Sequence, residues 1–198
     1  MRRLICLLAA LAALAGCAAQ NQPFADDATI AAVSYRNAGP TTLTLYTMLN
    51  NRTDAGAHTS LVIAASERVL FDPAGSFKAR GVPERNDVLF GFSPEVEQAY
   101  AGAHARETFR VVIQRVEVTA EQAELAYRLA LQAGPVAGGF CASSTAGILR
   151  QIPGFEGIRA SLLPERVMED FGKLPGVQTR VYREYDDPDL QAAIARLN

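Results

Sequence analysis

The order of apolar and polar positions divides the chain into an apolar N-terminal run and a longer part in which strand-like and helix-like patterns alternate. The run Leu4–Ala15 contains only apolar residues. Alternation of apolar and polar residues predicts strands, most clearly in Thr108–Val118. A capping residue followed by helical spacing predicts helices, as in Thr119–Ala133, where Gln122 stands three residues after Thr119. The expected strands are 41–49, 58–64, 68–72, 87–92, 108–118 and 178–183, and the expected helices are 93–102, 120–133, 141–151, 164–171 and 188–197. This mixture predicts a single domain of the α+β class.

The apolar run has the features of an export signal. Met1–Arg3 carries two positive charges, and Leu4–Ala15 is too short to span a bilayer as a permanent helix. The last two residues of this run and the two that follow it, Leu14–Ala15–Gly16–Cys17, resemble the bacterial lipobox, which implies cleavage before Cys17 and lipid attachment to it. The alternatives are an ordinary secretory signal cut near Ala18, or a retained anchor helix.

Lipid on Cys17 implies a place for the protein in the cell. Two or more acyl chains, such as palmitate, hold a protein stably on a membrane surface. Ala18 after the lipidated residue points, by the sorting pattern of enteric bacteria, to the outer membrane, facing the periplasm. We therefore expect a signal peptide at 1–16, the lipidated Cys17 and a tether at 17–40, and a folded domain at 41–198. The expected partner is the membrane itself, through the lipid on Cys17.

Composition and charge exclude several classes of protein. Of 198 residues, 49% are hydrophobic and 20% are charged, which argues against extended disorder. The net charge of −2 gives no basis for nucleic-acid binding. Cys141 is the single thiol outside the export segment, which excludes a disulfide scaffold. A free Cys often serves as a small buried apolar residue, and that interpretation of Cys141 stays open.

A second interpretation of Cys141 is that it is a nucleophile. It follows Gly138–Gly139 at the expected start of a helix, where free N–H groups and the helix dipole favour a thiolate. His58 opens a strand, and Asp72 ends the strand expected to return beside it. Adjacent strands lie roughly 5 Å apart, so this carboxylate can orient the imidazole. Glu67, at the turn, is the weaker candidate for that role.

Other polar residues are weaker candidates for chemistry. His104 lies in an alanine-rich segment expected to be a surface helix end, and is an alternative base. Ser143, Ser144 and Thr145 lack a surrounding GxSxG pattern, so helix capping or packing explains them better. Two distant histidines without paired cysteines predict no metal site, and no cofactor is expected.

Three stretches together resemble the circularly permuted NlpC/P60 branch of the papain-like superfamily, which includes the lecithin retinol acyltransferase-like proteins. They are HTSLVI from His58, VLFDPAG around Asp72, and GFCASST around Cys141. The resemblance spans roughly residues 43–183 and implies an antiparallel sheet packed against helices. It also implies Cys141 as nucleophile, His58 as base and then acid, and Asp72 as its orienting residue. Relatives often have a polar residue where Phe140 stands, and Glu or His where Asp72 stands, so the substrate class stays open.

Two functions are expected from these observations. The first is a cell-envelope thiol hydrolase or acyltransferase that acts on an amide or ester through a thioester, with peptidoglycan peptide or lipid as substrate. The second is a non-catalytic envelope lipoprotein that uses the same fold to bind or scaffold a partner. An ordinary, inert thiol at Cys141 would favour the second.

Overall fold

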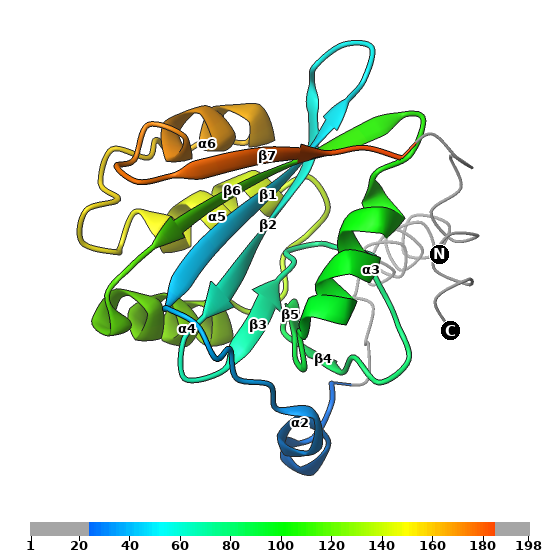
Figure 1. Cartoon of the computed structure of the whole chain (residues 1–198), viewed down its shortest axis with the longest axis vertical. Coiled ribbons are helices and arrows are strands. Elements are labelled where there is room, and N and C mark those ends of the chain that lie inside the picture. The colour runs from blue at the N-terminus through cyan, green and yellow to red at the C-terminus, as the bar shows by residue number, and fades with distance from the viewer. Residues whose placement is uncertain (1–23, 185–198) are drawn as a thin grey trace, which may run out of the picture.

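The computed structural model describes residues 24–184 and has a seven-stranded sheet at its centre (Figure 1). The strand order is β4-β5-β3-β2-β1-β6-β7, and every neighbouring pair is antiparallel. The elements in chain order are α2 (Asp27–Val33), β1 (Thr42–Asn50), β2 (Gly56–Ala64), β3 (Arg68–Phe71), β4 (Glu84–Arg85), β5 (Val88–Leu89), α3 (Pro94–His104), β6 (Phe109–Glu117), α4 (Ala120–Ala133), α5 (Cys141–Leu149), α6 (Pro164–Phe171) and β7 (Gln178–Tyr182). The predicted α+β class is confirmed.

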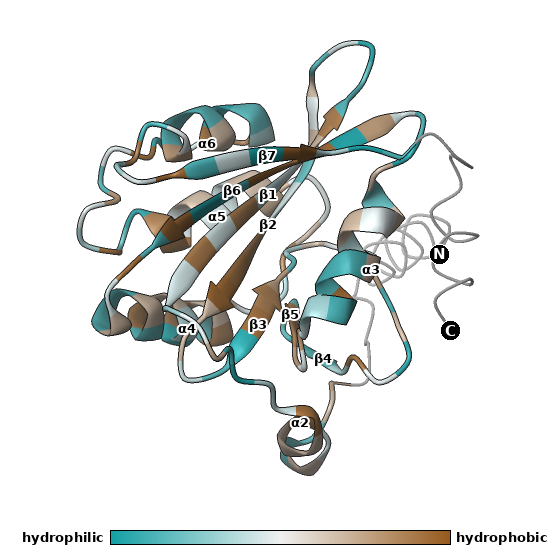
Figure 2. Ribbon diagram, viewed as in Figure 1, coloured by the Kyte–Doolittle hydropathy of each residue, from teal (hydrophilic) through white to brown (hydrophobic). Residues whose placement is uncertain are grey.

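The helices cover the two faces of the sheet unequally. Helices α4, α5 and α6 lie on one face, whereas α3 lies alone on the other (Figure 1). Each face has its own core, because residues of a strand alternate between the two faces. Leu43 and Leu45 of β1 pack with the α4–α6 layer, and Tyr46 and Met48 pack with the α3 layer. Hydrophobic residues follow the central strands, and hydrophilic residues are frequent on α6 (Figure 2).

Most predicted elements are present close to their expected bounds. The alternating segment around residues 108–118 forms β6, which pairs along its whole length with β1. Thr119 caps α4 in a complete capping box with Gln122, as the sequence indicates. Ser93 caps α3, and Pro94 occupies its first turn, where a missing N–H costs nothing.

Within residues 24–40 the structure contains a helix that the sequence prediction lacks. The part of the expected tether that the structure describes contains α2, and it contacts the body of the domain. Ile30 and Val33 pack against the core on the α4–α6 face, and Arg85 bonds both the Ala25 carbonyl, at 2.5 and 2.8 Å, and the Asp27 carboxylate. A composition of small and polar residues favours a tether, but the contacts of Ile30 and Val33 with the core hold this short helix against the domain.

Two further differences concern short strands. The strand expected at 87–92 is reduced to β5, and its partner β4 was not predicted. The predicted signal peptide, Cys17 and the helix at 188–197 lie outside the described residues. Within residues 24–184, no helix combines the length and apolar character needed to cross a bilayer.

Candidate active site

An early end to β3 creates the space in which the candidate site is built. The register between β2 and β3 ends at the pair Leu61–Phe71, so residues 56–60 of β2 have no β3 residue beside them. His58 lies on this part of β2, and Asp72 is the first residue after β3. The helix α5, which begins at Cys141, packs against β2. The end of β3 therefore leaves room for the start of a helix beside the edge of a strand.

His58 and Asp72 are directly bonded. Nε2 of His58 lies 2.7 Å from Oδ1 of Asp72, whose side chain is almost fully buried while that of His58 is 18% exposed. Tyr100, on α3, donates its hydroxyl hydrogen to the same carboxylate oxygen at 2.7 Å and lies 2.9 Å from Oγ of Ser60. A buried carboxylate needs such partners, because its charge is otherwise unsatisfied. These contacts fix the carboxylate that orients the imidazole.

A histidine bonded through Nε2 keeps Nδ1 for a second partner. Besides Asp72, Cys141 interacts with the His58 side chain, and Nδ1 is the ring nitrogen that Asp72 leaves available to it. Burial alone would lower the pKa of His58, but the charge and hydrogen bond of Asp72, with a smaller contribution from Cys141, raise it to about 10. His58 is therefore an imidazolium at neutral pH.

Cys141 lies at the first position of α5 and is 6% exposed. Burial raises the pKa of its thiol, but the hydrogen bond and charge of His58 outweigh burial and hold the pKa below its usual value. The backbone N–H groups of Thr59 and Ala142 contribute in the same direction. The thiol therefore ionises more readily than an ordinary cysteine, in spite of its burial.

The first turn of α5 supplies free donors around this sulfur. Phe140 gives no side-chain cap, and the first main-chain bond of the helix runs from Ser144 N–H to the Phe140 carbonyl at 3.0 Å. The N–H groups of residues 141–143 have no helical carbonyl to bind. Such donors can stabilise negative charge that develops on a carbonyl oxygen next to the nucleophile.

His104 is placed differently from the sequence expectation of a surface residue. It is partly buried beside His58, with the two rings stacked at a centroid distance of 6.3 Å, and its Nδ1 lies 2.8 Å from the Tyr100 carbonyl. Burial lowers the pKa of His104, which keeps the ring neutral next to the charged His58. Tyr100 and His104 are four residues apart on one face of α3, so they reach the site together.

A pocket of about 230 Å³ opens beside His58 on the α3 side. Its wall is partly apolar, with Met48, Ala103 and Phe109. Besides His58, its polar members are Ser76, His104 and Arg106. On the helix side, Phe140 stands directly before the nucleophile and is 51% exposed. Apolar surface therefore lies on both sides of the Cys141–His58 pair.

Asp87 ties together the two loops that carry Asp72 and Cys141. Its Oδ2 accepts bonds from the backbone N–H of Ala74 at 2.9 Å and of Val136 at 3.0 Å. Asp87 itself is buried and has a left-handed backbone with φ of 60°. Sequence reasoning missed this residue, because its role depends on a turn that the local pattern does not reveal.

The structure brings together Cys141, His58 and Asp72, as the sequence predicted. Glu67 does not reach the site: its carboxylate accepts a bond from the Tyr127 hydroxyl at 2.8 Å. Ser143 donates its hydroxyl to the Phe140 carbonyl at 3.0 Å, which is a local helix-end contact. Tyr100 and Ser60 were missed, although Ser60 shares a strand face with His58.

Among residues 24–184, no group of three or more His, Cys, Asp or Glu side chains is arranged to hold a metal ion. Comparison of the chain with protein families, with characterised proteins and with solved structures gives no match.

Gly75 provides a test of the position of Asp72 in which no polar side chain is replaced. A Cβ at Gly75 would lie 1.9 Å from Oδ2 of Asp72, so Gly75→Ala must displace that carboxylate. We expect the free energy of unfolding to fall by about 1–3 kcal/mol, which is typical of overpacking. We also expect alkylation of Cys141 at pH 6 to slow, because His58 loses its aligned partner.

Gly138→Ala is the matched control, since nothing lies within 4 Å of the Cβ it would add. Urea denaturation and the alkylation rate of the Cys141 peptide, followed by mass spectrometry, check both variants. Equal behaviour of the two variants would contradict the proposed positioning of Asp72.

Proposed function

We propose that the protein is a thiol hydrolase or acyltransferase that cleaves or transfers an acyl group from an amide or ester. The observation that supports this most strongly is the chain of contacts from Asp72 through His58 to Cys141. It pairs a protonated histidine with a thiol of lowered pKa at the first turn of a helix. A structural cysteine needs neither a charged histidine nor free backbone donors.

In the proposed reaction, the Cys141 thiolate attacks the carbonyl carbon of the substrate, and the C=O electron pair moves onto oxygen. The N–H groups at the start of α5 stabilise that oxyanion. His58 then gives its proton to the leaving amine or alcohol as the C–N or C–O bond breaks, leaving an acyl thioester on Cys141. His58, now neutral, takes a proton from water or another acceptor, whose oxygen or nitrogen attacks the thioester and releases Cys141.

Asp72 and Tyr100 act through His58 and are positioning residues. Asp72 keeps its charge because His58 and Tyr100 lower its pKa in spite of its burial. The fixed Nε2–Oδ1 bond holds the Nδ1 side of the ring toward the thiol.

The proposal extends to the fold family of the domain, its location in the cell and its substrate classes. The order of His, acidic residue and Cys along the chain, and an antiparallel sheet with a helix that begins at Cys141, support a permuted papain-like fold of the NlpC/P60 type. Lipidation at Cys17 would place the site at an outer-membrane surface facing the periplasm. Peptidoglycan peptides and lipid acyl groups are the proposed substrate classes, and the apolar surface near Phe140 suits an acyl chain or an apolar side chain.

Acylation of the enzyme by p-nitrophenyl esters tests this function. We expect p-nitrophenyl acetate and octanoate to give a burst of p-nitrophenol and an acyl adduct on the Cys141 peptide. Hydroxylamine at neutral pH should release that adduct, as it does for a thioester. Cys141→Ala should lower the burst by at least about a hundredfold, since the nucleophile is gone.

Ser144→Ala is the control, because it removes a neighbouring hydroxyl and leaves the thiol in place. It should acylate like the natural protein. Absence of any adduct on Cys141, together with an ordinary thiol pKa, would favour the binding-lipoprotein alternative.

A further inference from the structure

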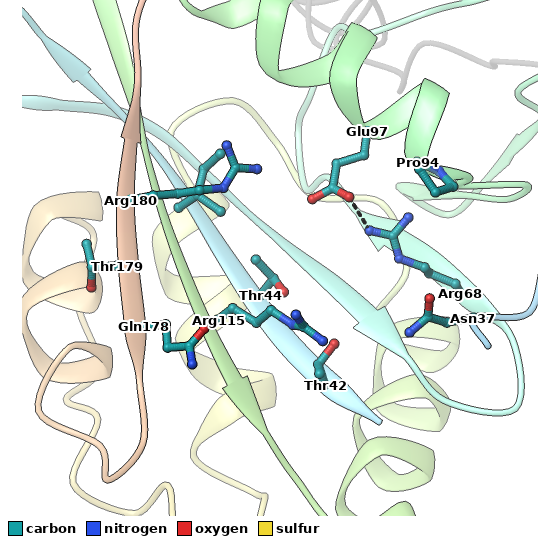
Figure 3. A pocket seen from close by; sticks show the side chains of 11 residues that line it. Asn37, Thr42, Thr44, Arg68, Pro94, Glu97, Arg115, Gln178, Thr179 and Arg180 are labelled. Atoms are coloured by element: carbon teal, nitrogen blue, oxygen red, sulfur yellow. Dashed lines mark hydrogen bonds and ion pairs between the residues drawn. The ribbon is translucent and has the colours of Figure 1, made fainter. Parts of the chain in front are cut away.

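A polar hollow on the open part of the sheet lies apart from the candidate active site. It has a volume of about 500 Å³, and β1, β6 and β7 line it together with the start of α3 (Figure 3). This part of the sheet belongs to the face that α3 covers only in part (Figure 1). Nothing in the proposed chemistry of Cys141 uses this hollow.

Three arginines and one glutamate set the charge of the hollow. Arg68 is already satisfied: it donates to the Phe92 carbonyl and to Glu97, each at 2.5 Å. The other oxygen of Glu97 accepts the Tyr46 hydroxyl. The one carboxylate that lines the hollow is therefore fully engaged before any ligand arrives.

Arg115 and Arg180 provide the positive charge that remains. In the sheet register Arg180 stands opposite Ile113, two positions along β6 from Arg115, so the two arginines are diagonal neighbours on one face. Both are exposed, and within the described residues neither has a carboxylate partner. Figure 3 shows both side chains extending across the sheet toward the α3 side. Like charges placed side by side in this way favour a bound anion.

Hydroxyl and amide groups surround these two arginines. Thr42 and Thr44 of β1 lie in the sheet at 4% and 5% exposure, and Thr44 stands opposite Arg115 in the register. In the described part of the chain, neither threonine hydroxyl has a hydrogen-bond partner of its own. Asn37 and Gln178 add amides at the margin. Such groups suit the hydroxyls of a polyol, and the paired guanidinium groups suit a phosphate.

We infer that this hollow binds a phosphorylated polyol, such as a sugar phosphate or the glycerophosphate headgroup of a lipid. Arg115 and Arg180 hold the phosphate oxygens, and the threonine and amide groups bind the hydroxyls. The inference does not depend on the reactivity of Cys141.

Calorimetric titration of the purified full-length chain tests the site, with glucose 6-phosphate, glucose and inorganic phosphate as probes. We expect saturable binding of glucose 6-phosphate that is tighter than that of inorganic phosphate, and no detectable binding of glucose. Arg115→Gln and Arg180→Gln should each weaken binding about tenfold, and the double variant about a hundredfold, because each removes a charge-assisted hydrogen bond. Both arginines are exposed, so the variants should fold, which circular dichroism checks.

The matched control is the double variant Arg128→Gln with Arg150→Gln, which removes two exposed arginines elsewhere and gives the same net charge. It should bind like the natural chain.

Vesicles of phosphatidylcholine with and without phosphatidylglycerol distinguish a lipid headgroup from a soluble sugar phosphate. Binding that depends on phosphatidylglycerol and on Arg115 and Arg180, without binding of the sugar phosphate, assigns the site to a lipid headgroup. Failure of both probes to bind, or equal losses in the two double variants, would overturn the inference.

Discussion

Replacement of His58 by alanine is expected to move the reaction of Cys141 with iodoacetamide from neutral and mildly acidic pH to alkaline pH. In the natural chain, the imidazolium of His58 lowers the pKa of the thiol, so alkylation should begin at a lower pH than it does for an ordinary cysteine. Without His58, burial remains and opposes ionisation. A thiol with a pKa of 8.5 is well under 1% thiolate at pH 6, so the rate there should fall by about tenfold for each unit by which His58 lowers the pKa of the thiol.

The measurement is the pH profile of alkylation of the Cys141 peptide in the full-length chain, by mass spectrometry. The same measurement in concentrated urea is the control, because unfolding removes the influence of His58. Both chains should then titrate near 8.5. If the natural chain titrates near 8.5 when folded, or if His58→Ala leaves its profile unchanged, the proposed pairing is wrong.

Replacement of Asp72 by asparagine should cost the most stability of any change at the site. Removing one partner of a buried ion pair leaves the other charge uncompensated, at a cost of about 3–5 kcal/mol at neutral pH. Tyr100 also loses a charged acceptor. Chemical denaturation at pH 7 measures this loss, and Asn keeps the size of the side chain, so a cavity does not explain the result.

The same variant should change how stability depends on pH. The pKa of His58 is raised on folding to about 10, so its contribution is complete below about pH 6.5 and is lost as the pH rises through 10. The pKa of Cys141 is lowered, so its contribution grows as the pH rises toward about 8.5. Between about pH 6.5 and 8.5, the contribution of His58 to stability decreases while that of Cys141 increases, so the two changes offset each other. The net loss of stability should therefore occur between about pH 8.5 and 10.

Asp72 adds a contribution on the acid side. Its pKa is lowered on folding, so this contribution is present above about pH 4 and is lost as the pH falls through the folded value. Asp72→Asn should abolish this acid-side loss and flatten the decline between pH 8.5 and 10. Unfolding curves from pH 3 to pH 10.5 for both chains check these expectations, and an unchanged alkaline slope in the variant would argue against a charged His58.

Much of the sheet follows from local sequence, because long segments that alternate in polarity specify a strand. Thr42–Asn50 and Phe109–Glu117 are of this kind, and both are present as predicted. The missed elements are short. The two residues of β4 carry no periodic signal, and α2 depends on a single capping bond from Thr29 N–H to Asp26, 2.7 Å long, and on contacts with the distant core.

The candidate site was only partly predictable, for a similar reason. Cys141 and His58 stand out because each has an unusual chemistry and a signal of helix or strand start beside it. Tyr100 has no such signal: it reaches Asp72 from a helix on the other face of the sheet. The environment of His104 likewise depends on where α3 packs, which the alanine-rich pattern around it does not show.

The early end of β3 also links the reactivity of the thiol to the completeness of the fold. The edge of β2 beside His58 is completed by the first turn of a helix that comes much later in the chain, so the Cys141–His58 contact forms only when α5 has docked. In an unfolded chain the thiol has an ordinary pKa and is mostly protonated at neutral pH. Any local opening that separates α5 from β2 returns the thiol to this less reactive state. At mildly acidic pH, the rate of thiol modification therefore falls as the fraction of chains in which this helix is detached rises.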